Sequence, residues 1–183
     1  MDNLLPLIGQ TIPDLTLEIF HQEKIKKINL AQYRGSWLIL FFYPADFTFV
    51  CPTELAELAQ NYNEFRKLKA EIISISCDTA FFHNAWHKES PLIKQITFPM
   101  GADPAGKLAQ AFGAYLTEEG LARRATFLID PDGVIKAMEM HDNTLGRNSQ
   151  ELLRKLQAAI FLRENKGQLC PASWQPGSPA IIL

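Results

Sequence analysis

The sequence lacks several features that would point to other classes of protein. Its three cysteines, Cys51, Cys77 and Cys170, lie far apart and form no C-x-x-C pair, which excludes a thioredoxin-type redox motif and a zinc knuckle. Basic residues form no run apart from 24–27 and 123–124, and the formal net charge is -2. This charge pattern favours neither nucleic acid nor an anionic membrane as a partner.

The length of the chain predicts a single domain. With 183 residues, 47% of them hydrophobic, it is long enough for one sizeable core and too short for two domains to be expected. We predict one domain over residues 1–183, with residues 168–183 as a C-terminal tail. Residues 1–8 lack the basic start, the uninterrupted apolar core and the cleavage site of a secretion signal, so we expect a cytoplasmic protein. In a reducing compartment an odd number of cysteines favours chemistry over a disulfide framework.

The apolar runs of the chain predict its fold class. Residues 37–43 form an unbroken apolar run, typical of a strand buried on both faces, and residues 70–76 form a β-branched run. Helical spacing of apolar residues predicts a helix over 52–68 between them, and this order predicts a parallel βαβ unit. We therefore expect an α/β domain of three layers around a mixed central sheet.

Shorter patterns predict the elements on either side of this unit. Residues 15–19 alternate as a strand would, residues 24–27 indicate a solvated turn or a hairpin, and residues 101–106 are typical of a turn. In the predicted helix 79–88, His83 and His87 lie four residues apart, a spacing that can bind zinc. No H-E-x-x-H pattern or third ligand accompanies them, so we expect a solvated helix face instead.

The C-terminal half of the chain predicts a hairpin and a last helix. An Asp-Gly turn at 132–133 joins the predicted strands 125–130 and 134–140. Ser149 is expected to cap the last helix and Gly167 to end it.

Cys51 occupies a position where a cysteine becomes reactive. The predicted strand ends shortly before it, and Pro52 falls in the first helical turn, where proline is favoured. Free amide donors and the positive end of the helix dipole favour the thiolate there. The Thr48 hydroxyl is expected within reach of both the sulfur and a substrate oxygen, so it could donate a hydrogen bond to one and accept a hydrogen bond from the other. Pro44 can shield the sulfur, because its ring adds apolar bulk and no donor. The alternative is an inert buried cysteine.

The pattern Pro-x-x-x-Thr-x-x-Cys, formed by Pro44, Thr48 and Cys51, resembles the active-site signature of the peroxiredoxins. Residues 124–130 are similar to the segment of that family in which an arginine three residues before a phenylalanine enters the active site. The resemblance thus implies that Arg124 is the active-site arginine and that Arg123 is solvated; the alternative is that both are ordinary charges at a strand edge.

The same resemblance implies that Glu54 and Arg147 form an ion-pair network with the active-site arginine. Glu54 falls in the first helical turn and could orient a guanidinium by a bidentate pair. Each of the two residues can instead be an ordinary capping or dipole-complementing charge.

Residues 169–177, which contain Cys170, are similar to the resolving-cysteine segment of the typical two-cysteine peroxiredoxins. This second resemblance implies that Cys170 of a partner subunit attacks the sulfenic acid on Cys51 and forms an intersubunit disulfide. It implies a homodimer, often assembled into a decamer of five dimers; the alternative is a tail thiol without a role. Cys77 matches no catalytic cysteine of the family, and we interpret it as structural.

The resemblance covers nearly the whole chain and implies a thioredoxin-like fold. The sequence segments 83–87, 121–127 and 152–155 are most similar to those of the bacterial alkyl hydroperoxide reductase C (AhpC) branch of the family. They imply a thiol peroxidase that reduces hydrogen peroxide and small organic hydroperoxides without a metal or a bound cofactor. Its reductant would be a thioredoxin or a flavoprotein disulfide reductase. Two alternatives stay open: a thiol-disulfide oxidoreductase, which the missing C-x-x-C disfavours, and an interaction protein acting as a holdase or peroxide relay.

Overall fold

A computed structural model describes residues 7–183 of the chain. The prediction drawn from residues 1–8 therefore rests mainly on residues outside this range. Within it, no helix is both long enough and apolar enough to cross a membrane.

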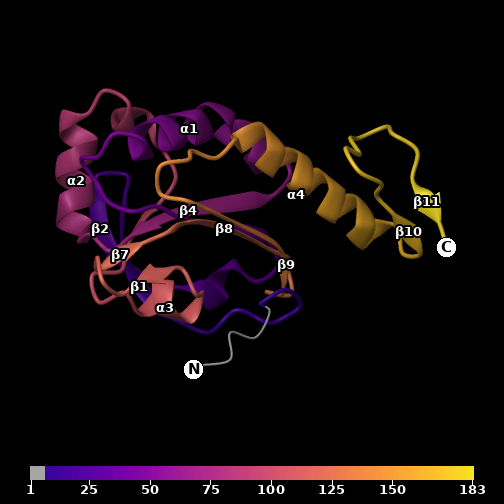
Figure 1. Ribbon diagram of the computed structural model, residues 1–183, viewed down its shortest axis with the longest axis horizontal. Helices are drawn as coiled ribbons and strands as arrows, with labels where there is room; N and C mark the ends of the chain where they lie inside the picture. The colour runs from indigo at the N-terminus through magenta and orange to yellow at the C-terminus, as the bar shows by residue number, and fades with distance from the viewer. Residues whose placement is uncertain (1–6) are drawn as a thin grey trace.

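A seven-stranded mixed sheet forms the centre of the molecule, in the order β2-β1-β5-β4-β3-β8-β9 (Figure 1). β3 (Trp37–Phe42) and β4 (Ala70–Ser76) pair in parallel, and α1 (Cys51–Lys67) connects them, which confirms the predicted βαβ unit. All residues of β3 are buried, as its apolar run predicted. The other strands of this sheet are β1 (Thr16–His21), β2 (Lys24–Asn29), β5 (Met100–Ala102), β8 (Arg124–Ile129) and β9 (Ile135–His141).

Helices cover both faces of the sheet and give the predicted three layers (Figure 1). α1 and α4 (Ser149–Glu164) share a core cluster with β3 on one face. α3 (Lys107–Ala111) packs on the other face beside Phe112, and α2 (Ala80–Glu89) lies at one end of the sheet. The short elements are η1 (Leu30–Tyr33), η2 (Ile93–Gln95), β6 (Tyr115–Leu116) and β7 (Leu121–Ala122).

The predicted hairpins both form. β1 pairs with β2, so residues 24–27 belong to a hairpin strand and not to a turn. β8 pairs with β9 across the Asp-Gly turn.

Three local predictions were wrong. Of the predicted turn 101–106, residues 103–106 do form a turn, but residues 101–102 belong to β5, where a Cβ on Gly101 would lie 2.8 Å from the Leu17 side chain. Asn148, not Ser149, caps α4, since its side chain accepts a hydrogen bond from the amide of Glu151. Finally, α4 ends at Glu164, three residues before Gly167, so that glycine serves the connection that follows the helix.

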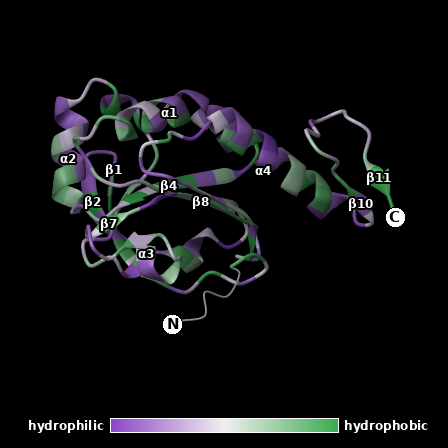
Figure 2. Cartoon of the chain, viewed as in Figure 1, coloured by the Kyte–Doolittle hydropathy of each residue, from purple (hydrophilic) through white to green (hydrophobic). Residues whose placement is uncertain are grey.

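The C-terminal tail forms a small lobe beyond the end of α4 (Figure 1). In it, β10 (Gln168–Leu169) pairs with β11 (Ile181–Ile182). Figure 2 shows that β11, at the outer side of this lobe, is hydrophobic, and Ile182 is 80% exposed. The lobe thus carries apolar surface outside the core.

Candidate active site

Cys51 is the first residue of α1 and is completely buried. Its sulfur accepts a hydrogen bond from Arg124 Nη1 at 3.3 Å. Two features therefore place positive potential near this sulfur: the N-terminal end of a 17-residue helix and a guanidinium donor. Because the thiolate is the nucleophilic form of cysteine, the site can attack an electrophile that reaches it.

Glu54 joins two arginines that come from distant parts of the chain. Its Oε2 accepts a hydrogen bond from Arg124 Nη1 at 2.6 Å, and its Oε1 accepts one from Arg147 Nε at 2.9 Å. Arg147 Nη2 also donates to Oε2 at 3.1 Å, which makes this pair bidentate. The structure thus brings together the three residues that the sequence analysis grouped around Cys51.

Burial and charge act against each other in this network. Burial alone would raise the pKa of the Glu54 carboxyl, but the hydrogen bonds and charges of the two arginines outweigh it and lower the pKa. Burial lowers the pKa of the Arg147 guanidinium, although Glu54 opposes the shift. Since a buried charge that loses its partner costs several kcal/mol, the three residues depend on one another.

Further contacts to the arginines come from residues that sequence reasoning missed. The Arg147 guanidinium lies 3.4 Å from the centre of the Phe41 ring, and its Nη1 donates to Thr126 Oγ1 at 3.1 Å. Arg124 Nε donates to the carbonyl of Asn143 at 2.9 Å. Phe41 and Thr126 lie inside strands and Asn143 follows β9, so no short motif singles them out. Such contacts fix each guanidinium in position.

Arg123 and Arg124 differ in their burial and in their contacts with the site. Arg124 is 3% exposed and touches the sulfur of Cys51, whereas Arg123 is only partly buried. Successive residues of an extended chain point to opposite sides, so only one of two neighbouring arginines can reach the site.

The loop between β3 and α1 carries Pro44 and Thr48. Pro44 is buried, and the Thr48 hydroxyl donates to the carbonyl of Ala45 at 2.8 Å. The sequence analysis expected Thr48 both to donate and to accept at the site. In this conformation its hydrogen is already used, so its oxygen is left to accept one from a substrate or a thiol.

Cys77 and Cys170 have surroundings unlike those of Cys51. Burial, together with the charges of Asp103 and Asp78, raises the pKa of Cys77 to about 12, which keeps it a thiol. Burial also raises the pKa of Cys170, although Arg154 opposes the shift. Neither of these thiols is therefore activated in this conformation.

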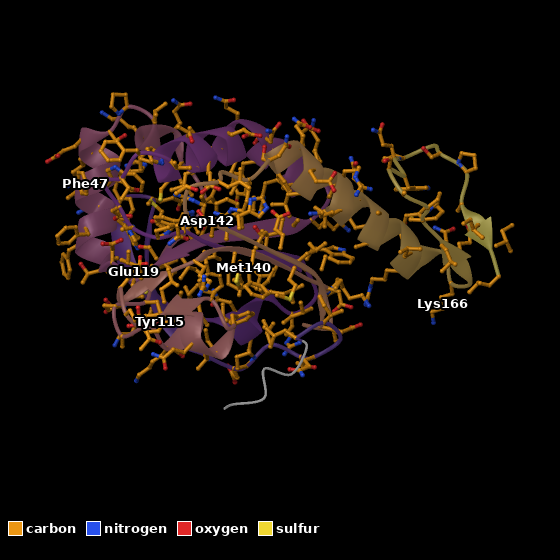
Figure 3. The ribbon with its side chains drawn as sticks, in the orientation of Figure 1. Phe47, Tyr115, Glu119, Met140, Asp142 and Lys166 are labelled. Carbon is orange, nitrogen blue, oxygen red and sulfur yellow. The ribbon has the colours of Figure 1, made fainter. Side chains whose placement is uncertain are left out.

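Cys170 lies in the C-terminal lobe, far from α1 (Figure 1). Phe47 precedes Cys51 by four residues and Lys166 precedes Cys170 by four, and Figure 3 places the two at opposite ends of the molecule. The lobe is attached to α4 through Trp174, whose ring centre lies 4.7 Å from that of Phe161. Within one chain, then, the two sulfurs lie far beyond the roughly 2 Å of a disulfide bond.

The prediction of a solvated face for His83 was wrong. His83 is 0% exposed and its Nδ1 lies 2.8 Å from Asp46 Oδ2, while His87 on the next turn is partly buried. Helical spacing places the two histidines near one another but does not say which of them faces the core. Among residues 7–183, no group of three or more His, Cys, Asp or Glu side chains could hold a metal ion.

Comparison with known proteins agrees with this geometry. The model of the AhpC/TSA family matches residues 8–138. The chain is 41% identical over 177 residues to the alkyl hydroperoxide reductase C of Pseudomonas aeruginosa, covering 97% of this chain and 95% of the relative. It is 42% identical over 178 residues to the protein of the same name from Amphibacillus xylanus, with the same coverage.

Solved structures show the same similarity. The crystal structure of Enterococcus faecalis AhpC superposes with a TM-score of 0.89 at 40% identity, covering 91% of this chain and 100% of that one. The reduced 2-Cys peroxiredoxin of Plasmodium vivax superposes with a TM-score of 0.92 at 28% identity, covering 96% and 93%.

Proposed function

The chain belongs to the AhpC/TSA family and is a thiol-dependent peroxidase of the peroxiredoxin type with a thioredoxin-like fold, and on this premise we propose that Cys51 attacks the peroxide. The observation that carries the assignment is the contact of 3.3 Å between Arg124 Nη1 and the buried sulfur of Cys51. The proposed substrates are hydrogen peroxide and small organic hydroperoxides, reduced without a metal or a bound cofactor.

In the first step the Cys51 thiolate attacks one peroxide oxygen and the O–O bond breaks. The sulfur becomes a sulfenic acid, and the leaving oxygen takes up a proton as water or an alcohol. Arg124 stabilises the charge that moves from the sulfur to the leaving oxygen. Thr48 accepts a hydrogen bond from the peroxide, Pro44 excludes water, and Glu54 and Arg147 hold Arg124 in place.

In the second step the thiol of Cys170 from a partner subunit attacks the sulfenic acid. The S–S bond forms, the S–O bond of the sulfenic acid breaks, and water leaves. The position of Cys170 supports this proposal, because its lobe extends away from the body that holds Cys51 of the same chain (Figure 1).

The proposed assembly is a homodimer, with five dimers forming a decamer. Apolar surface at two ends of the molecule supports it. One surface, the aromatic patch, lies around α2 and contains Phe47, Phe49, Phe81 and Phe82, which are 49% to 94% exposed. The other is on the C-terminal lobe, where Ile181, Ile182 and Leu183 are 52% to 85% exposed. Two separate surfaces allow each protomer to form two different interfaces, as a ring of dimers requires.

The remaining proposals follow the family. One domain over residues 1–183 carries residues 168–183 as its tail, and the protein is cytoplasmic, where three free cysteines are stable. A thioredoxin or a flavoprotein disulfide reductase reduces the disulfide.

Peroxide turnover with a catalytic amount of each reductant, kept reduced by an excess of its own electron donor, tests this function. We expect many equivalents of peroxide to be consumed, and the oxidised protein to migrate as a disulfide-linked dimer on a non-reducing gel. A protein that consumes about one equivalent and stops would be a relay or a holdase instead. An oxidised monomer that has lost two hydrogens by mass would contradict the intersubunit disulfide.

A further inference from the structure

A buried histidine–aspartate pair joins α2 to the loop between β3 and α1. His83 and Asp46 both have 0% side-chain exposure, and His83 Nδ1 lies 2.8 Å from Asp46 Oδ2. The other ring nitrogen, Nε2, lies 3.0 Å from the carbonyl oxygen of Gly101 in β5. Both ring nitrogens of His83 thus have a polar partner, one on the loop and one on β5, and the ring bridges the two.

Hydrogen-bonded contacts with Tyr43, Asp78 and His83 hold Asp46 in place. Its Oδ1 accepts a hydrogen bond from the Tyr43 hydroxyl at 2.7 Å, at the end of β3. Its amide donates to Asp78 Oδ2 at 2.9 Å, and that carboxylate also accepts from Ser76 Oγ at 2.6 Å, at the end of β4. Asp46 therefore connects the ends of two central strands with α2 through its contact with His83.

The loop that contains Asp46 is strained. Phe47 has a φ of 54°, a left-handed conformation that bulky residues rarely adopt and that persists only where the surroundings impose it. The Phe47 ring also packs edge-on against Phe82, with ring centres 6.4 Å apart, and in a tilted arrangement against Trp86, with ring centres 5.9 Å apart; both partners lie in α2. The same loop positions Pro44 and Thr48 relative to Cys51.

We propose that His83 is a positioning residue for peroxide reduction: through its pair with Asp46 it holds this loop in the conformation that presents Pro44 and Thr48 at Cys51. The inference rests on the proposed function. His83 does not touch the substrate and acts only through the shape of the loop. Since misplacement by about 1 Å can cost roughly a hundredfold in rate, a released loop should slow the first step strongly.

The test compares His83→Gln with His87→Gln, the other histidine of the same helix. At a temperature where all variants are folded, we expect His83→Gln to slow the oxidation of Cys51 by hydrogen peroxide about 10- to 100-fold. The rate at which iodoacetamide alkylates Cys51 should not fall, because a loosened loop admits the reagent. His87→Gln should leave both rates near those of the wild type.

A double-mutant cycle separates positioning from a merely structural role. Asp46→Asn should slow the same step, and the double variant should be no slower than the slower single variant, because both changes break one pair. If His83→Gln lowers the melting temperature but oxidises at the wild-type rate, or if the two effects multiply, the inference is overturned. A wild-type protein without turnover would instead contradict the proposed function.

If His83→Gln does not fold, the wild-type protein still gives an answer. In hydrogen-exchange measurements on the wild type, the Asp46 amide, which donates to Asp78, should exchange slowly. Fast exchange at Asp46 would contradict the fixed loop on which the inference rests.

Discussion

Cys51 lies in the packed centre of the molecule, whereas Cys170 lies in a small lobe outside it. The sulfur of Cys51 is within 3.3 Å of a guanidinium that is itself paired with a buried carboxylate. Cys170 follows a two-residue strand, and its sulfur lies 3.9 Å from the carbonyl oxygen of Ala158. The first sulfur faces a donor that stabilises charge, whereas the second faces a carbonyl acceptor.

This difference divides the proposed reaction into a rigid step and a mobile step. Attack on a peroxide needs prearranged donors, which the network around Cys51 supplies. Disulfide formation needs two sulfurs to approach within about 2 Å, which a buried cysteine and a docked tail cannot do without local unfolding. Substitutions at and around Cys51 and Cys170 test whether the two steps separate in this way, and we consider them from the largest expected effect to the smallest.

Cys51→Ser should abolish peroxide reduction while the fold is kept. A hydroxyl at the start of α1 has nearly the shape of the thiol but is not ionised, so we expect a loss of several orders of magnitude. Stopped-flow peroxide consumption and circular dichroism measure activity and folding. More than about a hundredth of the wild-type turnover in this variant would show that another group is the nucleophile.

Glu54→Gln should destabilise the protein by about 3 to 5 kcal/mol, because it leaves two buried guanidiniums without their carboxylate. Glu64→Gln is the matched control, since the pair of Glu64 with Lys67 is exposed and should be worth at most about 1 kcal/mol. Urea unfolding at neutral pH measures both changes. Equal losses in the two variants would mean that the buried network contributes no more than a surface pair.

The same substitution has a pH dependence of known sign. The pKa of Glu54 is lowered in the folded protein, so its contribution to stability is full above the unfolded pKa of about 4.3 and is lost as the pH falls through the folded value. The free energies of unfolding of wild type and Glu54→Gln should therefore converge below about pH 4. A constant difference down to pH 2 would contradict the assignment.

Arg124→Ala should slow the oxidation of Cys51 by about 2 to 4 kcal/mol, or roughly 30- to 1,000-fold, as for the loss of one oxyanion donor. Arg123→Ala is the control and should have little effect, since Arg123 lies outside the contacts described around the sulfur. Rapid mixing of each variant with peroxide gives the rate constants. Equal impairment of the two variants would show that the choice between the two arginines was wrong.

Cys170→Ser should have the smallest effect on the first step and should block the second. Cys51 is oxidised before Cys170 takes part, so the first exposure to peroxide should proceed at nearly the wild-type rate, and recycling should then stop at the sulfenic acid. Cys77→Ser should leave both steps unchanged. In the wild type, the first turn of α1 and residues 168–183 should exchange amide hydrogens faster in the disulfide form than in the reduced form.

Much of the fold could be predicted because its signals are local. The apolar run of β3, the proline after Cys51 and the Asp-Gly turn each act over a few residues, and each element formed where it was predicted. The errors have local causes too. Gly101 suggested a turn, but it lies within a strand and packs closely against the Leu17 side chain. Ser149 is a good capping residue, yet its neighbour Asn148 takes that position.

The sequence by itself determined that a cysteine begins a helix behind a buried strand, and its motifs identified the residues around that cysteine. Only the tertiary structure decided which of them meet. Glu54 binds Arg124 across 70 residues and Arg147 across 93, and His83 became buried because Asp46, 37 residues away, lies against it. Periodicity reports the local conformation of a chain, but partners at such separations are chosen by the packing of the whole core.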